Sequence, residues 1–345
     1  MLRNTRQLVG SCLCLALLGG ALSCAARRGA YFGKIAPPAD RALRYCTGPE
    51  IGSLDPQIGT SQSDYRIYMA LFEGLTEYDP RTIEPIPGLA ESWEVRGNSS
   101  EYIFHLRPNL RWSNGEPITA HDFVATIRRG LSPALASNNA YLGYGIKYAK
   151  AYNERAVFVR DPDSGRFLRE KDFSANAPEA DSPPAADDAP PENSFHHFLH
   201  EPARLTLPQD EAARAKKLAA DERLRVAVAG KEFVPVRAED IGVEAADGAT
   251  LRIVLGGTTP YFLGLTSHPF FRAVPRQMIE GDAKKVQSAG PAFVSSGAFK
   301  LESWELYDRL VVVKNPLYWD AARVQLEKII FYPLDELTTA MNLYK

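Results

Sequence analysis

The fold is decided by residues 87–127, which read PGLAESWEVRGNSSEYIFHLRPNLRWSNGEPITAHDFVATI. Between Tyr102 and Arg107, large apolar side chains stand at every second position, a spacing that predicts a half-buried β-strand. Asn114-Gly115 then predicts a tight turn, because glycine tolerates positive φ. Thr119, followed three residues later by Asp122, predicts the capped start of a helix.

Four pieces of this stretch, in this order and at this spacing, resemble the signature of the peptide-binding proteins of ABC importers. That family, extracytoplasmic solute-binding protein family 5, includes oligopeptide, dipeptide and nickel binders. The matching pieces are Ala90–Trp93, Tyr102–Arg107, Trp112–Gly115 and Thr119–Phe123. The resemblance implies an α/β fold of the periplasmic-binding-protein type II class, with a mixed-sheet main domain and a smaller α+β subdomain. It implies a receptor that binds oligopeptides and delivers them to a permease and ATPase complex.

A second block near the end of the chain resembles the same family. It comprises Gly297–Leu301, Lys314–Pro316 and Tyr318–Asp320, followed by an apolar strand at 329–331. In relatives the next helix leads into a second lobe. The resemblance therefore implies that this chain is the first lobe of a longer receptor, with the second lobe missing.

The first residues predict export. Residues 1–23 combine a basic start with a short apolar core, which is typical of a signal peptide. The run Ala21–Cys24 resembles a bacterial lipobox, which implies that Cys24 is lipidated and that residues 24–42 form a tether. The alternative is an ordinary secretory signal cut near residues 25–26, with Cys24 discarded. We expect a membrane-anchored lipoprotein of the periplasm or cell envelope.

Composition excludes several classes of protein. Forty basic residues stand against 42 acidic ones, and no basic stripe favours nucleic acid. Beyond Cys24, Cys46 is the single cysteine, so we expect no intramolecular disulfide in the folded body. We find no nucleophile-elbow, zinc-protease or phosphate-loop motif. Together with the family resemblance, this implies neither an enzyme nor a cofactor. We expect a monomer.

The sequence and its resemblance to the family also predict how the chain is divided into domains. Residues 43–60 and 240–345 form the expected main domain, and 61–239 form the subdomain. Within it, 154–229 is an insertion relative to the family, with a disordered part at about 174–194 that is rich in Pro, Ala and Asp. Helices are expected over 64–75 and over 209–225, the latter capped by Asp210.

Candidate ligand-binding residues follow from the resemblance. In relatives, the segment after Ser-Leu-Asp-Pro offers main-chain groups to the peptide, and the matching positions are Thr60, Ser61 and Gln62. A plain solvated loop is the alternative for these three. A tyrosine that faces the ligand in relatives falls at Asn138, and Tyr141 lies in a tyrosine-rich run that packs or lines the approach to the peptide.

Other readings remain open. His196, His197 and His200 could ligate a metal, but they lack a recognisable ligand spacing, so surface or interface histidines are favoured and no metal site is expected. The receptor could instead hold a nickel chelate, haem or an oligosaccharide. It could also be a peptide-binding chaperone or sensor that needs no permease.

Overall fold

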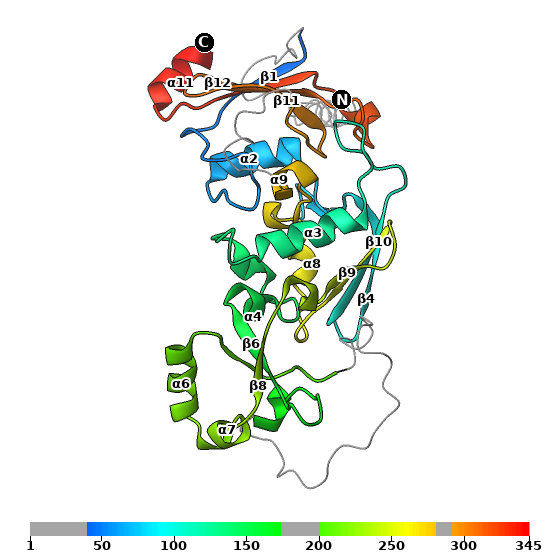
Figure 1. Cartoon of the computed structure of the whole chain (residues 1–345). Coiled ribbons are helices and arrows are strands. Elements are labelled where there is room, and N and C mark those ends of the chain that lie inside the picture. Colours follow the sequence, from blue (N-terminus) through cyan, green and yellow to red (C-terminus); the bar gives the residue numbers. More distant parts are fainter. Residues whose placement is uncertain (1–39, 174–200, 281–291, 345) are drawn as a thin grey trace, which may run out of the picture. The chain divides into compact units, whose positions relative to one another are not determined.

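The computed structural model describes residues 40–173, 201–280 and 292–344 (Figure 1). The chain divides into two compact units, Met1–Arg41 and Ala42–Lys345. The expected signal peptide, Cys24 and nearly all of the tether lie outside the described residues, as does the segment expected to be disordered. The account below concerns the second unit.

A four-stranded mixed sheet forms from both ends of this unit. Its order is β1 (Ala42–Cys46), β13 (Lys328–Tyr332), β12 (Arg309–Lys314) and β11 (Phe299–Glu305). Strand β1 runs parallel to β13, whereas the other pairs are antiparallel. The mixed sheet expected for the main domain is therefore confirmed.

The opening stretch supplies two strands of a second sheet, ordered β4 (Ala90–Arg96), β5 (Glu101–Leu106), β10 (Thr250–Val254) and β9 (Val243–Ala245). Strands β9 and β10 lie in the segment assigned above to the main domain, yet they extend the sheet of β4 and β5. The chain therefore passes from the second sheet to the first between β10 and β11, and not at residue 240, because β10 pairs with β5 along its whole length.

The predicted strand is confirmed as β5, but it is more buried than alternation implies. Tyr102, Phe104 and Leu106 are buried, and so is Ile103 on the opposite face, at 4% exposure. Ile103 lies between Arg252 and Glu94 on the neighbouring strands. The aliphatic parts of such long charged side chains can cover an apolar neighbour while their charged ends stay hydrated.

The predicted turn and helix start are also confirmed. Gly115 adopts a φ of +94°, and its amide donates to the Trp112 carbonyl oxygen at 2.9 Å. Helix α3 (Ala120–Gly130) follows, and the Thr119 amide donates to Asp122 Oδ2 at 2.7 Å. The Asp122 carboxylate thereby satisfies an amide that the helix itself leaves without a partner.

Helix α2 spans Gln62–Leu71 rather than 64–75. It begins earlier because Ser61 caps it, with the Asp64 amide donating to Ser61 Oγ and the Ser61 amide donating to Asp64 Oδ2, both at 3.0 Å. It ends earlier because Phe72 is extended.

A small sheet, ordered β7 (Thr206–Pro208), β6 (Ala156–Arg160) and β8 (Glu232–Pro235), takes its first two strands from the insertion and its third from the residues just after it. The expected helix over 209–225 is two helices, α6 (Glu211–Ala219) and α7 (Glu222–Ala227), because Asp221 caps a second start. Asp210 caps α6 as predicted, accepting from the Ala213 amide at 2.8 Å. The insertion has a core of its own: Val157, Val159, Leu205, Leu207, Leu224 and Val228.

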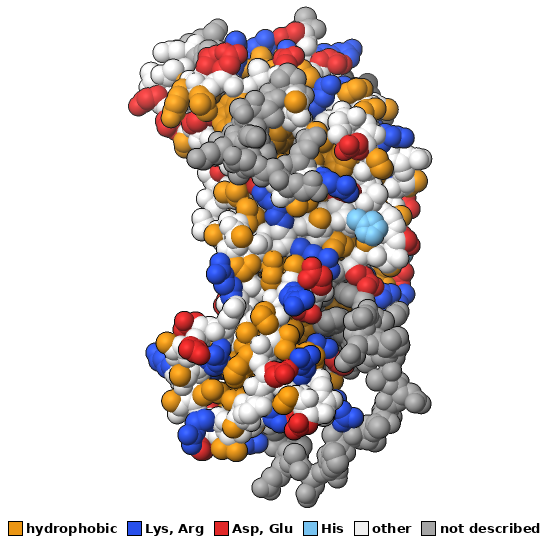
Figure 2. Space-filling model, in the orientation of Figure 1, with side chains coloured by type: hydrophobic (Ala, Val, Ile, Leu, Met, Phe, Trp, Pro, Cys, Tyr) orange, Lys and Arg blue, Asp and Glu red, His pale blue; other side chains and the backbone are white. Residues whose placement is uncertain are grey.

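The remaining elements are short and lie between or after these strands. They are β2 (Thr76–Tyr78), β3 (Pro85–Pro87), η1 (Ala140–Gly143), α4 (Ala149–Asn153), η2 (Glu170–Phe173), η3 (Ala238–Asp240), α8 (Phe262–Leu265), η4 (Pro269–Phe271), α9 (Arg276–Glu280), η6 (Ala321–Arg323) and α11 (Leu337–Tyr344). One hydrophobic cluster runs from the first sheet through α2 and α3 to the second. None of the helices that the structure describes is long and apolar enough to cross a membrane. On the face in Figure 2, basic and acidic side chains are interspersed.

A buried carboxylate joins the end of α2 to the second family block. Glu73 is 7% exposed, and it accepts hydrogen bonds from Trp319 Nε1 at 2.7 Å and from Tyr318 Oη at 3.1 Å. The Arg107 guanidinium lies 3.7 Å from the centroid of the Trp319 ring, a cation–π contact. Burial raises the pKa of Glu73 to about 7, against the two hydrogen bonds, which favour the ionised form.

This raised pKa predicts how stability changes with pH. Between about pH 4.5 and pH 7 the folded chain holds a proton on Glu73 that the unfolded chain releases, so the free energy of unfolding falls as pH rises through this window. Glu73→Gln removes the titration, and its amide can still accept from Trp319 and donate to Tyr318. We expect the variant to gain up to about 3 kcal/mol relative to the parent across this window.

Urea denaturation at several pH values measures this difference. Glu91→Gln, at an exposed position on β4, is the control and should show no such trend. A Glu73→Gln difference that stays constant from pH 4.5 to pH 7 would contradict the assignment.

Candidate ligand-binding site

A buried ion pair fixes the loop between β1 and α2. Arg129 Nη2, on α3, lies 2.6 Å from Asp55 Oδ2, and the two side chains are 11% and 5% exposed. Arg129 Nη1 also donates to Gln57 Oε1 at 2.6 Å, and Gln57 Nε2 donates to the Thr126 carbonyl oxygen at 2.7 Å. We call these four residues, Asp55, Gln57, Thr126 and Arg129, the Asp55–Arg129 network. They hold the loop against α3 with every buried polar group engaged.

A second set of contacts places the loop beside residues 137–141. Asn139 Nδ2 donates to the Gly59 carbonyl oxygen at 2.9 Å, and Ser137 Oγ donates to the Gln57 carbonyl oxygen. Gly59 itself is constrained, because a Cβ at that position would lie 2.0 Å from the Tyr68 hydroxyl oxygen. The two segments that carry the predicted site residues therefore lie side by side.

We call the surface where these two segments meet the candidate edge. The five predicted residues differ in environment there. Thr60, Gln62 and Asn138 are exposed, and Tyr141 is 62% exposed. The Ser61 hydroxyl is engaged as the helix cap described above. The geometry brings these residues together on one edge of the molecule; their contact with a ligand stays a prediction.

The main chain at Thr60 is distinctive. In the described part of the chain, neither its amide nor its carbonyl oxygen forms a hydrogen bond, whereas the Ser61 amide is bonded to Asp64. A main-chain donor and acceptor at one exposed residue are the groups that an extended peptide can pair with.

The tyrosines of the run at 141–152 fall into two groups, one that packs within the protein and one that is exposed. The Tyr144 hydroxyl donates to Asn153 Oδ1 at 2.7 Å, the Tyr148 hydroxyl accepts from the Arg204 amide at 2.9 Å, and Tyr152 packs against the core. These three have structural contacts, while Tyr141 faces solvent. Sequence reasoning missed an aromatic pair, in which the ring of Tyr65 on α2 contacts the ring of His268 before η4.

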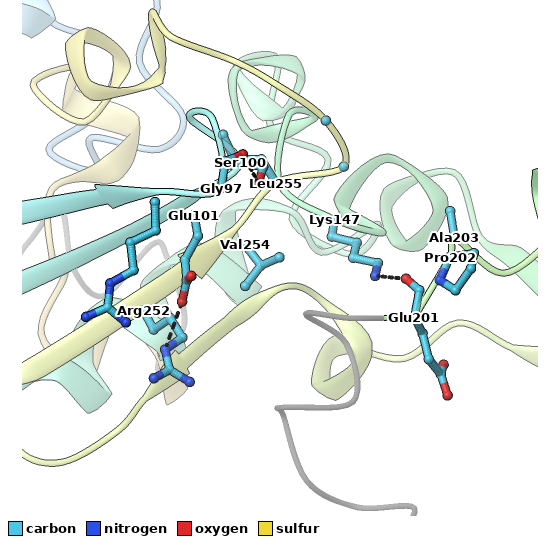
Figure 3. A pocket seen from close by; sticks show the side chains of 13 residues that line it. Gly97, Ser100, Glu101, Lys147, Glu201, Pro202, Ala203, Arg252, Val254 and Leu255 are labelled. Atoms are coloured by element: carbon cyan, nitrogen blue, oxygen red, sulfur yellow. Dashed lines mark hydrogen bonds and ion pairs between the residues drawn. The ribbon is translucent and has the colours of Figure 1, made fainter. Parts of the chain in front are cut away.

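A separate cavity of about 610 Å³ lies at one end of the second sheet (Figure 3). None of the predicted site residues lines it. Two of its cationic side chains have partners within the lining: Arg252 Nε lies 3.3 Å from Glu101 Oε1, and Lys147 Nζ donates to the Glu201 carbonyl oxygen at 3.0 Å. Burial lowers the pKa of Lys147. The residues that line this cavity do not indicate a particular ligand.

Metal binding finds no support among the described ranges, where no group of three or more His, Cys, Asp or Glu side chains could hold an ion. His196, His197 and His200 lie outside those ranges.

The Asp55–Arg129 network predicts a strong effect of removing one partner. Arg129→Met leaves the Asp55 carboxylate buried without a counter-charge, and we expect it to lower the free energy of unfolding by about 3 to 5 kcal/mol. Asp55→Asn combined with Arg129→Met removes both charges and should recover at least half of that loss.

Urea denaturation measures these changes. Arg81→Met is the control, since the Arg81 side chain is 88% exposed and lies 3.8 Å from Asp79, so its loss should cost less than about 0.5 kcal/mol. The network would not hold the loop if Arg129→Met cost no more than this control.

Comparison with known proteins places these features in a family. Residues 84–345 match the family described as bacterial extracellular solute-binding proteins, family 5 Middle. The chain is 30% identical over 301 residues to the periplasmic oligopeptide-binding protein OppA of Salmonella typhimurium, covering 86% of this chain and 40% of that protein. It is 27% identical over 307 residues to the probable deoxycholate-binding periplasmic protein YgiS of Escherichia coli, covering 88% and 42%.

Solved structures agree on the fold. The unliganded open form of the periplasmic murein tripeptide-binding protein MppA aligns with a TM-score of 0.62 at 23% identity, covering 89% of this chain and 44% of that one. The chain thus spans less than half the length of these relatives. Because the family match covers most of its residues and the α/β fold is shared, this chain belongs to the family 5 extracellular solute-binding proteins.

Proposed function

We propose that this chain forms part of the substrate-binding component of an ABC importer, which binds oligopeptides and delivers them to a permease and ATPase complex. Family membership supports a substrate-binding role, which is not an enzymatic one. The oligopeptide-binding relative at 30% identity supports a peptide as the ligand.

The open main chain at Thr60 is the observation that carries the proposal. A receptor that accepts many peptide sequences must bind what they share, which is the peptide backbone. Thr60 offers one donor and one acceptor at an exposed position, and the bonds from Asn139 and Ser137 hold the preceding residues in place. A loop that is ordered before binding loses little entropy when the ligand arrives.

The expected anchor and compartment belong to the same proposal. The receptor acts as a monomer in the periplasm or cell envelope, held at the membrane by lipid on Cys24. The pattern of residues 1–24 supports the anchor, and the periplasmic relatives support the compartment.

A different solute is the second candidate, and the similarity to the probable deoxycholate-binding protein favours it. A nickel chelate, haem or an oligosaccharide would fit the same class of receptor. A peptide-binding chaperone or sensor without a permease is the remaining alternative, which the absence of neighbouring permease and ATPase genes would favour.

Mass spectrometry of the bound ligand tests the proposal. The protein at its natural length is purified from cells without denaturation, and its ligand is then released with acid. We expect a mixture of short peptides, with a denatured and refolded sample as the empty control. A single steroid, metal chelate, haem or sugar would contradict the peptide assignment.

Two substitutions at Thr60 test main-chain recognition. Thr60→Ala keeps the amide and should leave peptide affinity within about threefold, whereas Thr60→Pro removes the amide hydrogen and should weaken binding by tenfold or more. Calorimetric titration of the full-length receptor with a tripeptide library measures both, and matched thermal unfolding confirms that both variants fold. Equal losses in the two variants would point to side-chain recognition instead.

A further inference from the structure

Two aromatic side chains extend the candidate edge beyond the residues considered so far. The Tyr65 ring, on α2, meets the His268 ring edge to face, with centroids 5.2 Å apart and planes at 85°. Burial raises the pKa of Tyr65, and the Tyr141 hydroxyl and the Asp64 carboxylate add to the rise, so both act on Tyr65 electrostatically. Segments far apart in the sequence thus meet at one aromatic group.

The polar atoms of this group remain available. His268 Nδ1 accepts a hydrogen bond from the Phe270 amide at 3.1 Å, so the proton of the neutral ring lies on Nε2. Burial, with a contribution from Arg272, lowers the pKa of His268 to about 4, which keeps the ring neutral at physiological pH. Among the described residues, His268 Nε2 and the hydroxyls of Tyr65 and Tyr141 have no hydrogen-bond partner.

Two charged groups act on these rings, namely Asp64 on Tyr65 and Arg272 on His268. The Asp64 carboxylate is 4% exposed and accepts from the amides of Gly52 and Ser61, both at 3.0 Å. Arg272 is 1% exposed and pairs with Glu77 at 2.7 Å. Because Asp64 is nearly inaccessible and Arg272 is already paired, a charged ligand side chain would lose hydration here without reaching a counter-charge, whereas an aromatic one would pack against ring faces and edges.

We propose that Tyr65 and His268, together with Tyr141, form a subsite for an aromatic side chain of a bound peptide, with a peptide carbonyl oxygen accepting a hydrogen bond from His268 Nε2. This inference rests on the proposed function, since it takes the ligand to be a peptide. It adds a selective contact to the sequence-independent one at Thr60.

Nuclear magnetic resonance titration of this chain tests the subsite, because the method detects the weak binding expected when only part of a receptor's contacts are present. The probes are Ala-Phe-Ala, Ala-Ala-Ala and Ala-Lys-Ala. We expect Ala-Phe-Ala to shift the ring signals of Tyr65, Tyr141 and His268 and to bind about tenfold more tightly than the other two.

Three variants sharpen the result. Tyr65→Ala should reduce the preference for Ala-Phe-Ala to less than twofold, while Tyr65→Phe keeps the ring and should retain it. Tyr307→Ala is the control, because Tyr307 is 83% exposed at the turn between β11 and β12, and this variant should leave the preference unchanged.

The outcomes separate the two proposals. Peptide-induced shifts at the Thr60 and Asn138 amides without shifts of the three rings would overturn the subsite and leave peptide binding intact. An unchanged preference in Tyr65→Ala would also overturn it. No shift anywhere at millimolar peptide would overturn both.

Discussion

The arrangement of the candidate edge depends on the buried pair of Asp55 and Arg129. Removing both charges from water is costly, and the cost is offset only because the carboxylate and guanidinium find further partners in Gln57. Gln57 links the loop to two other segments: its side-chain amide donates to the Thr126 carbonyl oxygen on α3, and its main-chain carbonyl oxygen accepts from Ser137 Oγ. The exposed residues on both segments are therefore held in position by buried hydrogen bonds, which restrict the conformation of the loop.

The family signature has a structural explanation that is separate from the ligand. Its pieces contact one another: Arg107, just after β5, stacks on Trp319, and Trp319 donates to Glu73, just after α2. The Ser113 amide, in the turn, donates to the Ser295 carbonyl oxygen at 2.8 Å. Residues that join the two sheets are restricted by packing and buried hydrogen bonds, whereas loop residues are free to vary.

Local patterns were enough to predict the strand at 101–106, the turn at Gly115 and the capped helix start at Thr119, because each depends on residues within one or two turns of chain. The features that local patterns failed to predict depend on contacts between residues that are distant in sequence. Strands β9 and β10 joined the second sheet through pairing with a strand about 150 residues away. The meeting of Tyr65 with His268 had no sequence signal, since each residue alone fits an ordinary amphipathic or Pro-flanked segment.

The same physical rule separates scaffold from site. Buried polar groups such as Gln57 and Glu73 have partners, because an unpaired one would cost more than a hydrogen bond returns. Along the candidate edge, the Thr60 main chain, the Tyr65 hydroxyl and His268 Nε2 have no hydrogen-bond partner among the described residues, and water can satisfy them until a ligand does. A ligand that replaces this water gains the most binding free energy where the protein is already ordered, because little further entropy is lost there. The order comes from the Asp55–Arg129 network and the bond between Asn139 and Gly59, so the signature that packs the scaffold also sets where recognition can occur.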